Sequence, residues 1–154
     1  MKSRIVAGQH SLSLCEEKKL YKLADTQLED KIRETLPVLV SAHLSQFSEL
    51  QSEIKLFNSL LWIYIQRKGV LERVADNVRL LLWVQYRISS INAFAAKLGL
   101  NPSFVGGLLG GEEAKLGGWN LANLMRICGV LKVSPEVLLF ADLAAAVRAV
   151  SGTK

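Results

Sequence analysis

The sequence has few of the residues that mark reactive sites or cross-links. In 154 residues there are two cysteines, two histidines and three prolines. Cys15 and Cys128 are isolated, with no CxxC pair, so we expect reduced thiols and no zinc site. His10 and His43 show no pairing with a carboxylate or a serine of the kind that suggests catalysis. We therefore expect no enzymatic activity, no metal and no cofactor.

Long apolar runs are also missing. The most apolar stretches, residues 60–65 and 80–84, are far shorter than the roughly 18 to 20 residues that cross a bilayer. Charged and polar residues break up the N-terminal segment, which does not fit a signal peptide. We expect a soluble, cytoplasmic protein that makes no contact with membranes.

Apolar residues, in contrast, make up 50% of the chain, and the net charge is +5. A chain of this length can bury a core without metal or disulfide staples. The positive charge permits contact with nucleic acid, but it is spread along the chain and no polybasic arm is present. No segment shows the alternation typical of strands, so the predicted fold class is all-α.

Two helices are predicted before residue 69. The first begins at Ser13 and should end near Thr35, because the residue before a proline is pushed out of helical geometry. From Pro37 no proline or glycine interrupts the chain until Gly69, which leaves about thirty residues for one helix on the order of 45 Å long. We place a domain boundary there, between residues 1–69 and residues 70–154.

A near-heptad seam of apolar residues runs along this long helix. Its members are Leu44, Phe47, Leu50, Ile54, Phe57, Leu61 and Tyr64. Two interpretations stay open: the seam packs against the first helix within one chain, or it joins two subunits. Residues 1–69 are thus expected to form a long helical hairpin that serves dimerisation or partner binding.

Residues 91–111 predict two short helices joined by a tight turn. The apolar face of the first ends at Leu98, and Gly99 follows where a left-handed residue would stop the helix. Asn101 then caps the second helix and Pro102 fills its first position. This pattern predicts a helix-turn-helix unit.

The C-terminal part predicts two more helices. Residues 112–118 are expected to form an exposed loop, and Asn120 to cap a helix that runs through Leu131. Ser134 should cap a last helix that continues to Val150. Trp83 and Trp119 are both expected to lie in the core.

Residues 71–140 are expected to hold five helices, with the turn between the second and third. The pieces that share one known pattern are Phe94-Ala-Ala-Lys-Leu-Gly-Leu100, Val105, Leu108, Gly111 and residues 121–139. Together they resemble the lambda-repressor-like family of DNA-binding domains, also called Cro/C1 or Xre-type. The resemblance implies that the helix at residues 102–109 enters the major groove of DNA.

The resemblance also implies which residues contact DNA. These are Arg87, Lys97, Asn101, Pro102, Ser103, Phe104, Gly106, Gly107 and Lys115. The third helix departs from the family, because it offers only Asn101 and Ser103 where Arg, Lys, Asn or Gln normally read bases. Its paired glycines either let backbone approach a phosphate or partner closely, or mark a helix that no longer reads DNA.

The expected function is that of a sequence-specific DNA-binding transcriptional regulator, a repressor of phage, plasmid or bacterial origin that acts as a dimer on double-stranded DNA. The alternative is a protein-interaction module with a degenerate helix-turn-helix, such as an antitoxin, an anti-activator or a phage-encoded inhibitor. A positive face built by Arg87 and Lys97 favours DNA, and a neutral third helix favours a protein partner.

Overall fold

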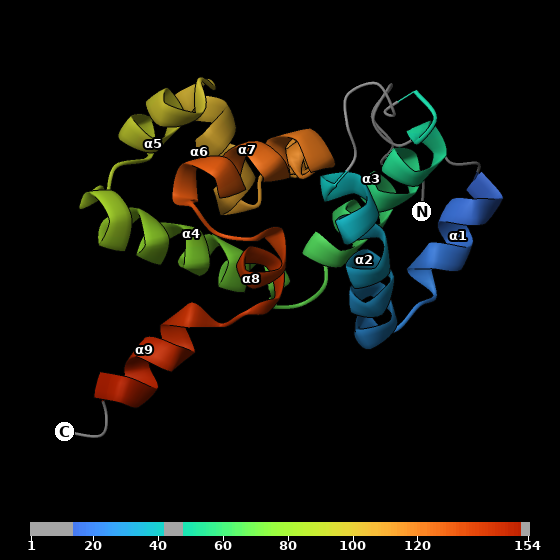
Figure 1. The fold of residues 1–154 in the computed structure, drawn as a ribbon, viewed down its shortest axis with the longest axis horizontal. Helices are drawn as coiled ribbons and strands as arrows, with labels where there is room; N and C mark the ends of the chain where they lie inside the picture. The colour runs from blue at the N-terminus through green and yellow to red at the C-terminus, as the bar shows by residue number, and fades with distance from the viewer. Residues whose placement is uncertain (1–13, 42–47, 152–154) are drawn as a thin grey trace. The chain divides into compact units, whose positions relative to one another are not determined.

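The computed structural model describes residues 14–41 and 48–151 (Figure 1). All regular elements within these ranges are helical and none is a strand, so the all-α prediction is confirmed. The chain divides into two compact units, one of residues 1–67 with 117–121 and one of residues 68–116 with 122–154.

No helix among the described residues has both the length and the apolar character needed to cross a membrane.

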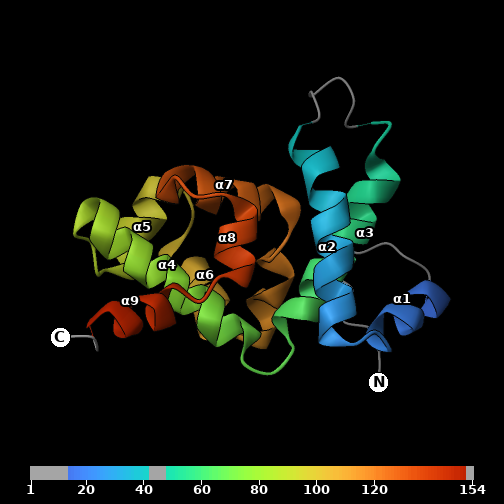
Figure 2. The same ribbon diagram turned by 60° about the horizontal axis from the view of Figure 1, so that its bottom comes forward.

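The first unit contains α1 (Leu14–Tyr21), α2 (Asp25–Val40) and α3 (Gln51–Ile65). Helices α2 and α3 lie side by side (Figure 2). Their shared core is made of buried apolar side chains, which include Leu28, Ile32, Leu36, Phe57, Leu60 and Leu61. Burial of such a face supplies most of the stability of helices this short.

The helix boundaries predicted for this unit are wrong. The predicted first helix is two helices, since the chain turns before Asp25, where Gln27 Oε1 accepts the Ala24 N–H at 2.8 Å. Pro37 lies inside α2, which runs on to Val40. The preference against helix before proline is only a bias, and burial on both sides of Pro37 outweighs it. The uninterrupted helix from residue 37 to 69 is therefore not formed.

Part of the predicted seam is used within the chain. Phe57, Leu61 and Tyr64 are 0% exposed, so these three side chains are not free to face a second subunit. Leu50 and Ile54 are half-buried. Two further members, Leu44 and Phe47, lie outside the described residues. These positions of the seam are not exposed because every residue of α3 from Ser59 to Ile65 is buried.

Arg67 fixes the turn between α1 and α2. Its guanidinium donates to the backbone oxygens of Tyr21 and Leu23 at 3.0 and 2.8 Å. It also forms an ion pair with Asp25, with Nη1 2.9 Å from Oδ1. One side chain at the end of α3 thereby holds the end of α1 and the start of α2.

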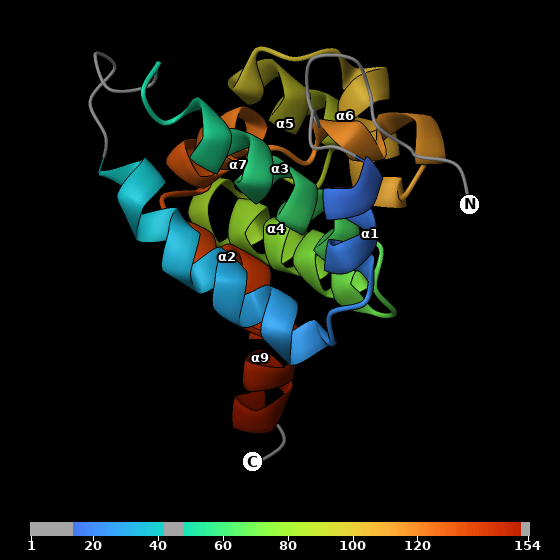
Figure 3. The same cartoon turned by 90° about the vertical axis from the view of Figure 1, so that its right-hand side faces the viewer.

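The second unit is built around α4 (Val70–Tyr86), which is drawn in green in Figure 3 and packs against helices that follow it in the chain. The helices that follow are α5 (Ile91–Leu98), α6 (Pro102–Gly110), α7 (Leu121–Leu131), α8 (Pro135–Phe140) and α9 (Leu143–Ser151). A 3-10 helix, η2 (Glu113–Gly118), precedes α7. The core of this unit includes Val74, Val78, Leu82, Phe94, Leu108, Leu124, Leu131 and Leu138.

The predicted last helix is divided in two at Ala141 and Asp142. The fully buried Asn77 of α4 donates through Nδ2 to the Leu138 and Ala141 backbone oxygens, at 2.9 and 2.8 Å. Its Oδ1 accepts the N–H of Leu143 at 3.0 Å. The Asn77 side chain thus forms hydrogen bonds with backbone groups that lack a helical partner where α8 ends and α9 begins.

Two further predictions for this region are wrong. Within residues 112–118, Glu113–Gly118 form η2 instead of an open loop, and Gly117 and Gly118 are buried. Trp119 is fully buried, which confirms its place in a core, whereas Trp83 is 50% exposed. The apolar run of α4 is wider than the face that its neighbours cover, so Trp83 turns outward beside the buried Leu82.

Candidate functional site

Helices α5 and α6 form a pair whose turn is set by local chemistry. Gly99 follows α5 in the left-handed conformation, with φ 71°, and the N–H of Leu100 donates back to the Ala95 oxygen at 3.0 Å. Glycine adopts this φ without strain. Asn101 begins α6, and its Oδ1 accepts the N–H of Ser103 at 2.8 Å. The predicted stop and cap are therefore both confirmed.

The outer surface of α6, all of whose residues are described, carries no charged side chain. Asn101, Pro102 and Ser103 are exposed, and Phe104 and Gly106 are half-buried. The Oδ1 atom of Asn101 is used by the cap, so the polar side-chain groups that this face presents are the Asn101 Nδ2 group and the Ser103 hydroxyl. The surface suits apolar or single hydrogen-bond contacts better than paired readout of bases.

Gly107 is buried, which corrects the expectation that it contacts DNA. A Cβ atom added there would lie 2.7 Å from Cγ of Lys115 and 2.8 Å from Oε2 of Glu112. Lys115 Nζ lies 3.7 Å from Glu112 Oε1 and donates to the Ser103 backbone oxygen at 3.5 Å. Lys115 therefore reaches back across α6 with its charge balanced, and it is a poor candidate for a phosphate contact.

Arg87 and Lys97 are exposed cations at the C-terminal end of α4, and the exposed Lys132 follows the end of α7 that is hydrogen-bonded to α4; we call these three residues the basic corner. The ammonium of Lys97 lies 4.3 Å from the centre of the Tyr86 ring. Arg87 directly follows Tyr86, and its guanidinium lies 5.5 Å from the centre of the Trp83 ring. Both cations are thus held against aromatic faces that tolerate their charge.

Two hydrogen bonds bring Lys132 to the same corner. The Tyr86 hydroxyl donates to the Val130 oxygen at 2.6 Å, and Gln85 Nε2 donates to the Leu131 oxygen at 3.1 Å. These bonds hold the end of α7, where Lys132 follows, beside the end of α4. Among the described carboxylates, none forms an ion pair with a cation of this corner.

The chain matches no protein-family model, no curated protein and no solved structure.

The positions predicted from the sequence to contact DNA include Arg87 and Lys97 but not Lys132. The position of Lys132 after a predicted helix does not indicate that it lies near the end of α4. That placement depends on the long-range hydrogen bonds of Gln85 and Tyr86. The remaining predicted positions fall on α6 and on the segment after it. The structure therefore separates a charged corner at α4, α5 and α7 from a neutral α6.

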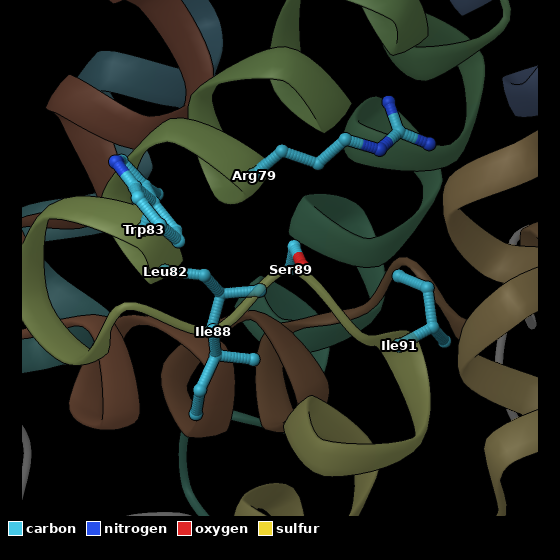
Figure 4. A pocket seen from close by; sticks show the side chains of 6 residues that line it. All are labelled: Arg79, Leu82, Trp83, Ile88, Ser89 and Ile91. Carbon is cyan, nitrogen blue, oxygen red and sulfur yellow. The ribbon is translucent and has the colours of Figure 1, made fainter.

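A pocket of about 170 Å³ lies between α4 and its linker to α5 (Figure 4). It is lined by Arg79, Leu82, Trp83, Ile88, Ser89 and Ile91. Figure 4 shows Trp83 and Ile91 on opposite sides with Ile88 between them, and the Arg79 side chain extended along one edge. The walls are mostly apolar, and the polar groups at the rim are a guanidinium and a hydroxyl.

Groups for covalent or metal chemistry are not gathered in the described part of the chain. No three His, Cys, Asp or Glu side chains within it lie close enough to hold a metal ion. Burial raises the pKa of the Cys128 thiol to about 12. The thiol therefore stays protonated at neutral pH and is a poor nucleophile.

Proposed function

We propose that the protein is a DNA-binding transcriptional regulator. In this proposal α4–α8 form a five-helix, lambda-repressor-like domain, α5 and α6 are its helix-turn-helix, and α2 and α3 form a helical hairpin. The observation that carries the proposal is the basic corner: Arg87, Lys97 and Lys132 have no carboxylate paired to them among the described residues. Unpaired surface cations of this kind suit the phosphates of a duplex.

Contacts to bases would come from the start of α6. The Ser103 hydroxyl can donate to or accept from a base edge, and the half-buried Phe104 ring can touch a thymine methyl group. Neither contact distinguishes all four base pairs from one another. We therefore expect affinity to depend mainly on phosphate contacts and sequence preference to be modest.

Salt dependence tests the proposal directly. Anisotropy of a labelled duplex from the region upstream of the gene would be measured over a series of KCl concentrations. Each phosphate contact contributes a slope of about −0.9 to the plot of log affinity against log salt. The triple variant Arg87→Gln, Lys97→Gln, Lys132→Gln should flatten that slope by about 0.9 for each cation that touches a phosphate in the unaltered protein.

The matched control is Arg148→Gln, which removes an exposed cation from α9. Its slope should equal that of the unaltered protein. No measurable affinity for the duplex at low salt, or equal slopes for the triple variant and the control, would contradict DNA binding through the basic corner.

A regulator of this type acts as a dimer on a two-fold site whose half-sites lie about one helical turn apart. With Phe57, Leu61 and Tyr64 buried in the chain, Leu50 and Ile54 remain as described seam positions for a second copy. Sedimentation equilibrium should give a dimer mass, and Ile54→Asp should lower it toward that of one chain. A monomer at every concentration would contradict this part of the proposal.

The second candidate is a protein-interaction module of the antitoxin, anti-activator or phage-inhibitor type. The observation that favours it is the uncharged surface of α6 with its half-buried Phe104. It predicts that Phe104→Glu abolishes capture of a protein partner while loss of the basic corner has no effect. DNA binding predicts the larger effect from the basic corner.

A further inference from the structure

None of the residues that line the pocket between α4 and its linker to α5 belongs to the basic corner, although the ring of one of them, Trp83, also contacts Arg87. Its walls combine the buried Leu82 with the half-buried Ile88 and Ile91. The indole of Trp83, half of whose surface is exposed, forms the opposite side. An aromatic side chain left exposed over an aliphatic wall can gain free energy when a flat apolar group enters between them.

The size of the pocket limits what it can hold. Its volume is about 170 Å³, and an apolar cavity of about 150 Å³ accommodates a benzene ring. Drug-sized sites begin at roughly 300 Å³. The pocket therefore suits a compound with a single ring.

The charge at the rim of the pocket further limits the chemical class of the ligand. Arg79 lines the pocket, and its Nη1 lies 3.5 Å from Oδ1 of Asp76, with both side chains more than half exposed. An exposed ion pair of this kind contributes little free energy, so the guanidinium can turn to another anion. A guanidinium binds a carboxylate through two parallel hydrogen bonds. Ser89 adds a hydroxyl on the same rim.

We propose that this pocket binds a small aromatic carboxylate. Its ring lies between Trp83 and the isoleucines, and its carboxylate meets Arg79.

A ligand here has a route to α6. Ile91 lines the pocket and also begins α5, and its Cγ2 atom lies 4.0 Å from the position that a Cβ at Gly106 would take. Displacement of Ile91 by a bound ring therefore changes the contact between α5 and α6. Its consequence for DNA affinity rests on the proposed function, whereas ligand binding itself does not.

The test uses the full chain with phenylacetate as the probe and phenylacetamide as its neutral analogue. Trp62 and Trp119 are 3% and 0% exposed, so a change in tryptophan emission reports on Trp83. We expect saturable quenching by phenylacetate, absent in Trp83→Phe, and binding of phenylacetamide that is about tenfold weaker.

Arg79→Gln should bring the two affinities together, while the control Arg148→Gln should keep the tenfold difference. Ser89→Phe should fill the pocket and abolish binding of both compounds. Equal affinity of the unaltered protein for both compounds, or no saturable signal from Trp83, would overturn the proposal. Anisotropy with labelled duplex then separates the two proposals: quenching by phenylacetate without any affinity for DNA supports the pocket and refutes the regulator.

Discussion

Asn77 is a buried amide whose contacts all go to the backbone where α8 ends and α9 begins. Asn77→Leu keeps a similar volume but leaves the Leu138 and Ala141 oxygens and the Leu143 N–H without this partner. A buried polar group without a partner costs about 1–3 kcal/mol. We expect the free energy of unfolding to fall by about 2–4 kcal/mol in urea denaturation.

The control for this prediction is Asn92→Leu, on an exposed position of α5. Substitutions at such positions change stability by about 0.5 kcal/mol or less. Equal unfolding midpoints for the two variants would mean that the Asn77 hydrogen bonds do not stabilise the junction.

Cys128 offers a prediction on pH and reactivity. In Cys15→Ser protein, the only remaining thiol is buried, and burial raises its pKa from 9.0 to about 12. Ellman's reagent should therefore label it only as fast as the protein unfolds. The thiol ionises at a lower pH in the unfolded chain than in the folded protein. Its contribution to the free energy of unfolding is therefore complete below pH 9.0 and is lost as the pH rises toward about 12. Labelling in buffer as fast as in urea would contradict this.

At the scale of one element, the adjacent glycines of α6 have different surroundings. A Cβ at Gly106 meets only Ile91 Cγ2, at 4.0 Å, which is an ordinary contact. Gly106→Ala should therefore raise the free energy of unfolding by about 0.5–1 kcal/mol. Gly107→Ala must displace Lys115 and Glu112, which cancels or reverses that gain. Urea denaturation of both variants tests this, and equal stabilisation would contradict it.

The end of α7 gives a prediction in which stability and binding change in opposite directions. Lys132 has φ 56°, and the N–H of Val133 donates to the Cys128 oxygen at 3.2 Å. Glycine takes this conformation without the cost of about 1 kcal/mol that other residues bear. Lys132→Gly should therefore raise the urea midpoint and lower affinity for DNA, because it removes one cation of the basic corner.

Arg87→Gly is the matched control, since Arg87 has the same φ of 56°. Its backbone gain is offset by loss of the contact between the guanidinium and the Trp83 ring. We expect a smaller rise in the midpoint than for Lys132→Gly. A lower midpoint for Lys132→Gly would show that its side chain stabilises α7 by more than the backbone strain costs.

At the scale of the whole molecule, no single cut separates the two units, because residues 117–121 group with the first. Trp119 in this segment is fully buried, and the Leu121 N–H donates to Asn58 Oδ1 at 2.8 Å. A fragment of residues 68–154 lacks Asn58 and the rest of the first unit. In a Trp83→Phe background we expect red-shifted Trp119 emission and a lower urea midpoint.

The full chain with Asn58→Ala serves as the control for the fragment. It removes one hydrogen bond at the start of α7 and should lower the midpoint by less than the fragment does. A fragment as stable as the full chain, with unchanged Trp119 emission, would show that the segment folds without residues 1–67.

The features that were predictable come from residues close in sequence. Gly99 stops α5, Asn101 caps α6 and Ser134 caps α8, where its hydroxyl accepts the Val137 N–H at 3.3 Å. Each involves groups within a few residues of one another, so one sequence determines them without knowledge of the fold. The positions of Arg87 and Lys97 in a candidate site came from a family resemblance, which remains a prediction.

The sequence by itself determined the all-α class and the ends of several helices, because caps and turns depend on neighbouring residues. Only the tertiary structure decided that α2 continues past Pro37, that Trp83 is exposed and Gly107 is buried, and that Lys132 joins the basic corner. Each of these depends on contacts between segments distant in the chain. Packing and long-range hydrogen bonds can outweigh a local preference of about 1 kcal/mol, and the sequence alone does not show where they do so.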